Sequence, residues 1–107
     1  MSTNENEKFE KIIKSTPSDE LEAMCKMLTA GTLVKNLDRA GSIISVDVLN
    51  TLYSDPVHIA AIKRLYQVLL VTVSEPIVHD ASGDKIVYAV NSKGREFLDY
   101  YQKQTHA

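Results

Sequence analysis

The chain has 107 residues, of which 44% are hydrophobic, and its formal net charge at pH 7 is −2. The length and the hydrophobic content fit one small domain with a single core. The net negative charge argues against a broadly basic surface of the kind that binds nucleic acid without regard to sequence. The single cysteine, Cys25, excludes an internal disulfide and every metal site built from paired thiolates. The longest apolar run, residues 68–71, is too short to span a membrane, so we expect a cytoplasmic protein. We also expect that it needs no cofactor.

Residues 1–15 form a segment of their own, a polar tail followed by a short amphipathic helix. Phe9, Ile12 and Ile13 share one side of this helix. A helix this short is unstable alone, so it must dock on the domain or on a partner. We assign residues 16–103 to one folded domain and residues 104–107 to a C-terminal tail.

Residues 16–41 are predicted to be helical. Thr16 is a candidate N-cap, and Pro17 suits the first helical position. Gly31 marks either a break between two helices or a weak point in one long helix, and Gly41 is typical of the left-handed residue that ends a helix. The apolar stripe of this segment consists of Leu21, Met24, Cys25 and Leu28, and continues through Leu33, Val34 and Leu37.

Residues 43–69 are predicted to contain an extended pair and then a tight helix–turn–helix. The first helix is capped by Ser45 and reaches Tyr53. The second helix begins with an Asp55 cap and Pro56 at the first helical position, and it runs to about residue 69. Its inner face is expected to carry His58 as a hydrogen-bonded histidine rather than a metal ligand.

The C-terminal third is predicted to be a β-hairpin followed by a helix. Two β-rich runs, residues 70–79 and 85–90, flank the turn sequence DASGD. Pro76 inside the first run implies an edge strand or a bulge. Asn91 or Ser92 caps the last helix.

The order of these elements resembles a winged helix-turn-helix domain. The implied fold is mainly α (α+β), with a two- or three-stranded β-wing and flanking N- and C-terminal helices. The ending KIVYAVNSKGREFLDYY is similar to the wing strand and closing helix of arsenic-repressor-like and multiple-antibiotic-resistance-like regulators, which commonly read Y-x-L-T-x-K-G-x-x-x-L. The matching residues are Tyr88, Val90, Asn91, Lys93, Gly94 and Leu98.

The resemblance implies a homodimer that binds double-stranded DNA in a sequence-specific way, as a transcriptional regulator or a partition protein. Its recognition helix would begin at Pro56 and Val57 and enter the major groove. The expected phosphate contacts are Lys63, Arg64, Lys85, Lys93 and Arg95.

Two features depart from the usual DNA-reading pattern. The reading positions carry apolar side chains, among them Ile59 and Ala60, which cannot form the bidentate bonds that discriminate bases. The tip of the predicted wing carries Asp80 and Asp84, which repel phosphate.

Two explanations remain open. In the first, the outer side of the Pro56 helix packs in a dimer interface with DNA at its edge. This arrangement resembles the DNA-binding adaptors of tubulin-like plasmid and prophage partition systems, which would add a filament-forming GTPase as a partner. In the second, the domain is a protein-interaction module that does not bind DNA. The candidate interface residues are Phe9, Ile12, Ile13, Ile59, Ala60, Tyr66, Tyr100 and Tyr101.

Catalytic motifs are absent from the sequence. It has no G-x-S-x-G elbow, no glycine-rich phosphate loop and no Cys–His signature. We therefore expect a protein that is not an enzyme.

Overall fold

The structure is a computed structural model that describes residues 3–105. Its helices are α1 (Thr3–Ser15), α2 (Ser18–Ala30), α3 (Pro56–Gln67) and α4 (Ser92–Thr105). Its strands are β1 (Thr32–Leu37), β2 (Ile43–Val48), β3 (Thr51–Tyr53), β4 (Val71–Val73), β5 (Val78–Asp80) and β6 (Gly83–Val90). The α+β fold class expected from the sequence is confirmed. Residues 1, 2, 106 and 107, at the ends of the two predicted tails, lie outside the described range.

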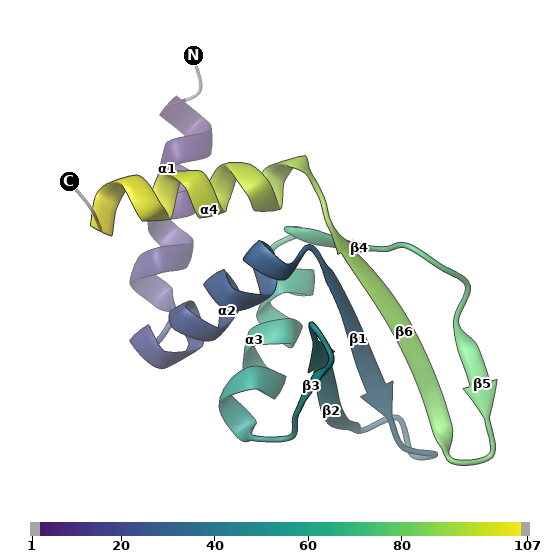
Figure 1. The fold of residues 1–107 in the computed structure, drawn as a ribbon. Helices are drawn as coiled ribbons and strands as arrows, with labels where there is room; N and C mark the ends of the chain where they lie inside the picture. Colours follow the sequence, from purple (N-terminus) through teal and green to yellow (C-terminus); the bar gives the residue numbers. More distant parts are fainter. Residues whose placement is uncertain (1–2, 106–107) are drawn as a thin grey trace.

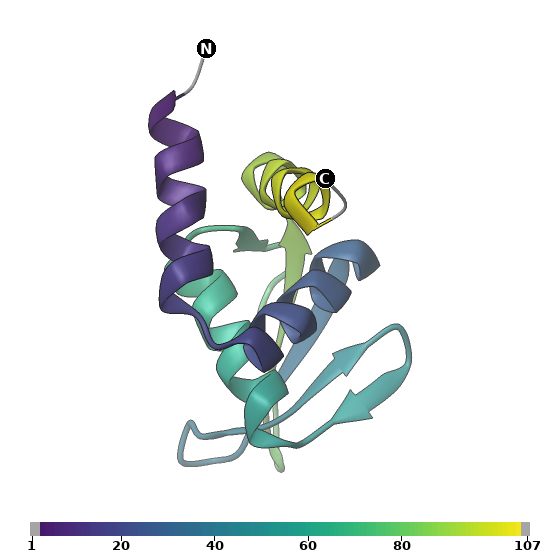
Figure 2. The same cartoon turned by 90° about the vertical axis from the view of Figure 1, so that its left-hand side faces the viewer.

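The strands form one antiparallel sheet in the order β3-β2-β1-β6-β4, and β5 also pairs with β6, on the side away from β1. Helices α2 and α3 pack against each other over one face of the sheet, while α1 and α4 lie beyond them (Figures 1 and 2). No helix among residues 3–105 covers the opposite face (Figure 2). We call this opposite side of the sheet the uncovered face.

The helix predicted over residues 45–53 is wrong. These residues form the β2–β3 hairpin, whose turn places Leu49 and Asn50 at positive φ angles of 49° and 65°. The spacing of the apolar residues had suggested a helix, but the alternating Val46 and Val48 are buried at 0% and 2% exposure on the helix-covered face. Because a hairpin precedes α3 in the chain, the tight helix–turn–helix expected over residues 45–69 is not formed.

The continuation of the helix beyond Gly31 is also wrong. Helix α2 ends at Ala30, and Gly31 has a φ of 87° that turns the chain into β1, the central strand of the sheet. A left-handed residue ends the helix, and the β-branched residues that follow suit a strand. Gly41 is left-handed as expected, with a φ of 86°, but it lies in the turn between β1 and β2 rather than at a helix end.

The C-terminal third follows the prediction closely. Strands β4, β5 and β6 occupy the two β-rich runs, and Pro76 lies between β4 and β5 at the edge of the sheet. Asn91 caps α4, because its Oδ1 accepts a hydrogen bond from the backbone N–H of Gly94 at 2.8 Å. The cap expected at Thr16 is wrong, since its hydroxyl donates to the carbonyl of Ile12 at 2.5 Å instead.

The core lies between the helices and the sheet. Its members include Met24, Met27, Leu33, Val46, Ile62, Leu65, Tyr88 and Phe97, all at 2% exposure or less. Helix α1 docks on this core through Phe9, whose ring centroid lies 5.4 Å from that of Phe97. The short N-terminal helix is therefore packed on its own domain.

Candidate functional site

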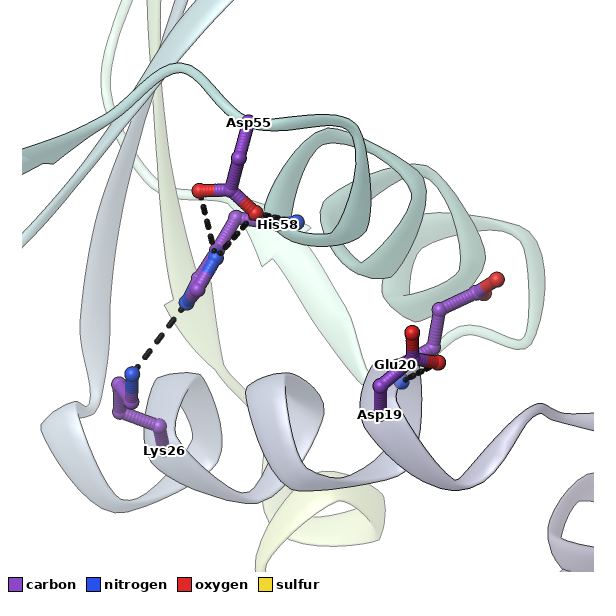
Figure 3. A network of polar contacts seen from close by, with 5 residues as sticks. All are labelled: Asp19, Glu20, Lys26, Asp55 and His58. Atoms are coloured by element: carbon purple, nitrogen blue, oxygen red, sulfur yellow. Dashed lines mark hydrogen bonds and ion pairs between the residues drawn. The ribbon is translucent and has the colours of Figure 1, made fainter.

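A polar network joins α2 and α3 at the start of α3 (Figure 3). Asp55 caps α3 by accepting a hydrogen bond from the backbone N–H of His58 at 3.1 Å. The Nδ1 atom of His58 lies 2.9 Å from both carboxylate oxygens of Asp55, and its Nε2 atom lies 3.3 Å from Nζ of Lys26 on α2. Because a lysine ammonium only donates, the neutral imidazole must donate from Nδ1 and accept at Nε2.

The network is completed by an aromatic contact from β3. The Tyr53 ring stacks on the His58 ring at a centroid distance of 3.9 Å and an angle of 10°. Nζ of Lys26 lies 4.7 Å from the centroid of the Tyr53 ring, within the range of a cation–π contact. The hydrogen bond from the His58 side chain holds the pKa of Asp55 below its usual value.

This network fastens three elements together rather than presenting a reactive group. Only 13% of the His58 side chain is exposed, and both of its ring nitrogens have partners. The inner, hydrogen-bonded position expected for this histidine is confirmed. The network fixes α3 to α2 and to the β2–β3 hairpin.

A second α2–α3 contact involves a residue expected to bind DNA. Nε of Arg64 donates to Oε1 of Glu20 at 3.3 Å, and both side chains are largely buried, at 30% and 17% exposure. Arg64 therefore faces α2 within the domain.

The uncovered face carries a shallow groove. In β1 the side chains alternate, so that Leu33 faces the helices while Val34 and Asn36 lie on the uncovered face. The strand register brings side chains of β2, β3, β5 and β6 to the same face. The groove has a volume of about 510 Å³, and the residues that shape its floor and sides are Val34, Asn36, Asp47, Leu52, Val78 and Val87.

The groove is largely apolar and open to solvent. Ile44, Leu52 and Val78 are 50%, 64% and 51% exposed. Single exposed apolar residues are common, but these three line the same groove and so form a contiguous apolar surface. Three charged residues line it, Asp47 on β2 and Asp84 and Lys85 on β6. Asp84 is hydrogen-bonded to His79, which leaves two residues of opposite sign, Asp47 and Lys85. Within residues 3–105, neither of these two side chains has an ion-pair partner.

The structure separates the residues predicted to contact DNA. Lys63 is exposed on α3, whereas Lys85 lies on the uncovered face. Lys93 and Arg95 lie at the start of α4, beyond the end of β6 (Figure 1). That end of the strand, Val90, is five residues and about 17 Å from Lys85. Nη1 of Arg95 donates to the carbonyl of Val90 at 3.1 Å.

The remaining residues of the predicted DNA contact and wing lie as follows. Pro56 is exposed and Val57 is packed against the core. Asp84 accepts a hydrogen bond from Nδ1 of His79 at 2.8 Å. The side chain of Asp80 lies outside what the structure describes.

Most of the predicted interface residues are used inside the domain. Phe9 is 5% exposed, and Ile12, Ile13, Ile59, Tyr100 and Tyr101 are partly buried against the core. Ala60 is half-buried, and Tyr66 is the most exposed of the set at 47%.

The residues of the uncovered face were not found from the sequence. The helix predicted over residues 45–53 includes Leu52, which hides the alternation of Leu52 with the partly buried Tyr53 on the helix-covered face. The signal that could have found them is the period-two pattern of residues 32–37 and 43–48, followed by a two-residue turn at Leu49 and Asn50.

Comparison of the chain with protein-family models, curated proteins and solved structures gives no significant match. None of the helices within residues 3–105 combines the length and apolarity needed to cross a bilayer. In the same part of the chain, no three His, Cys, Asp or Glu side chains are grouped so that they could hold a metal ion.

Proposed function

We propose that this protein is an interaction module that binds another polypeptide on the uncovered face of its sheet. The observation that carries the proposal is the groove of about 510 Å³ lined by the exposed side chains of Ile44, Leu52 and Val78. A contiguous apolar surface with a polar surround is typical of a protein-binding site. Covering each of these half-exposed side chains contributes on the order of 1 kcal/mol to binding.

The groove is supported by a rigid base. Its central strand, β1, is paired on both sides, with β2 and with β6. On the opposite face, the core residues Leu33, Val46 and Tyr88 hold the same strands against α2 and α3. A surface fixed in this way loses little conformational entropy on binding, which favours affinity.

Binding to double-stranded DNA, the main expectation from the sequence, stays a prediction with less support. A DNA-binding surface requires cationic side chains that converge on phosphates. Arg64 is paired with Glu20, and Lys85 and Lys93 lie near opposite ends of β6. Fluorescence anisotropy with duplex DNA at several salt concentrations tests this prediction, and salt-sensitive binding that Lys63→Glu weakens would support it. The regulator and partition roles both depend on that result.

A photo-crosslinking residue at position 52 tests the proposed interaction module directly. Benzoylphenylalanine replaces Leu52, which is 64% exposed, and a control variant carries it at Glu22 on the exposed side of α2. In cells that express the protein natively, we expect protein adducts from position 52 and few from position 22. Absence of adducts from position 52, or equal yields from both positions, would overturn the proposal.

A further inference from the structure

We infer that the partner on the uncovered face is a second copy of this chain, related to the first by a two-fold axis. This inference rests on the proposed function and names the occupant of its groove. It is carried by the position of Asp47 and Lys85, the two charged residues of the groove that have no ion-pair partner within residues 3–105.

The two charges lie on either side of the central strand. Asp47 is directly opposite Val34 in the β1–β2 register, and Lys85 is directly opposite Asn36 in the β1–β6 register. They are therefore two strands apart and two residues apart along the strands, which separates them by about 12 Å. At that distance they do not pair within the chain, and each needs a charged partner when the face is covered.

A two-fold axis supplies both partners at once. Let two copies meet face to face, with the axis parallel to the sheets, perpendicular to the line from Asp47 to Lys85, and passing through the midpoint of that line. Each Asp47 then lies over the Lys85 position of the other copy, and the exchange is reciprocal, as a two-fold interface requires. The apolar side chains of Val34 and Val87, which lie between the charges, meet their own counterparts at the centre.

The size of the face fits a weak dimer. Five strands at the usual spacing and length give a surface roughly 20 Å wide and 20 Å long. This is on the order of 400–500 Å² per copy, below the about 800 Å² of a standard interface. We therefore expect a dimer that dissociates on dilution.

Charge reversal and mixing test the inference. The wild-type protein and the variants Asp47→Lys and Lys85→Asp are analysed by sedimentation velocity over a range of concentrations. In a dimer of either variant, position 47 of each copy would face position 85 of the other with the same charge, lysine against lysine or aspartate against aspartate. We therefore expect each variant alone to be monomeric. An equimolar mixture restores two opposite pairs, because one chain supplies both lysines and the other both aspartates. We expect the mixture to form a dimer of twice 11.9 kDa.

Two controls keep the result interpretable. Lys63→Glu reverses an exposed lysine on α3, outside the face, and is expected to leave the dimer unchanged. Leu52→Asp places a charge in the apolar groove, so it should abolish the dimer. Because Leu52 is exposed, this substitution spares the core, and the test stands even if a charge variant fails to fold. Circular dichroism establishes that each variant is folded.

The outcomes separate this inference from the proposed function. A wild-type protein that is monomeric at millimolar concentration overturns the inference, as does a dimer that survives Leu52→Asp or a mixture that stays monomeric. If position 52 nevertheless crosslinks to a different protein, the proposed function stands and only the identity of the partner is wrong. If position 52 gives no adduct at all, both fail.

Discussion

The hydroxyl of Tyr100 on α4 donates a hydrogen bond of 2.5 Å to Oε2 of Glu10 on α1, which joins residues 90 positions apart in the chain. Gln104 donates to the same oxygen. These bonds, together with the packing of Phe9 on the Tyr100 and Phe97 rings, hold the N-terminal helix on the domain. They lower the pKa of Glu10, with the Tyr100 bond as the largest cause, and raise the pKa of Tyr100.

The first prediction concerns pH and the Glu10–Tyr100 bond. A carboxyl whose pKa is lowered in the folded state stabilises that state above its unfolded pKa, and the contribution is lost as pH falls through the folded value. We expect wild type to be more stable than Glu10→Gln at pH 7, and the difference to shrink below about pH 4.5, the usual pKa of the group. Urea unfolding at several pH values measures it. A difference that stays constant down to pH 2 would contradict the prediction.

An NMR titration checks the cause of that shift. In Tyr100→Phe the carboxylate of Glu10 loses its strongest donor, so its pKa should rise toward the usual value. Tyr101→Phe is the matched control, because the Tyr101 ring stacks on Phe97 with centroids 6.3 Å apart and a phenylalanine ring keeps that contact.

The second prediction concerns the cap of α3. Replacing Asp55 by alanine removes the acceptor of the His58 N–H and leaves the imidazole without its carboxylate partner. We expect the free energy of unfolding to fall by about 1–2 kcal/mol. Asparagine caps almost as well as aspartate, so Asp55→Asn should cost less. Urea unfolding measures both free energies. If the two variants lost the same stability, the side-chain oxygen that accepts from the His58 N–H would not be the source of the stabilisation.

The third prediction concerns Gly94, in the first turn of α4. A Cβ at this position would lie 2.3 Å from the carbonyl oxygen of Leu70 and 2.7 Å from Cγ1 of Val90. Because backbone would have to move, we expect Gly94→Ala to destabilise the protein by about 1–3 kcal/mol. The comparison variant is Gly41→Ala, which meets no atom within 4 Å and carries only the strain of its left-handed backbone. A Gly94→Ala protein as stable as wild type would show that α4 does not approach the carbonyl of Leu70 this closely.

The fourth prediction concerns the reactivity of Cys25. Burial, with a smaller effect of Glu22, raises the pKa of the thiol from 9.0 to about 11. The thiolate is the reactive form, so at pH 8 alkylation should be about 100-fold faster in the unfolded chain than in the folded one. Glu22→Gln should speed the folded-state reaction slightly. Equal rates of Cys25 alkylation in the folded and unfolded protein would contradict the raised pKa of the thiol.

How much could be predicted from the sequence depends on whether the signal is local. The start of α3 was predicted correctly because Asp55 and Pro56 act within one turn. The start of α4 with its Asn91 cap, and the turn between β5 and β6, were likewise found from short motifs. The β2–β3 hairpin was missed because Val46, Leu49 and Leu52 fit a helical spacing, and only pairing with β1 decides the strand.

The uncovered face was missed for the same physical reason. Its residues share a face only because β1 lies between β2 and β6, an order that depends on pairing between segments about 50 residues apart. Once the strands are in register, Leu52 and Val87 lie on the same side of the sheet. Propensity and periodicity act over a few residues and do not determine this order.

The central claim is that the uncovered face is the binding surface, and methyl NMR with a soluble paramagnetic agent tests it most directly. The methyl groups of Ile44, Leu52 and Val78 report on the face, and Leu69, 69% exposed at the end of α3, reports on a surface outside it. When protein concentration is raised, the account predicts that the first three are shielded from the agent while Leu69 stays accessible. Shielding of Leu69 with continued exposure of Ile44, Leu52 and Val78 would contradict it.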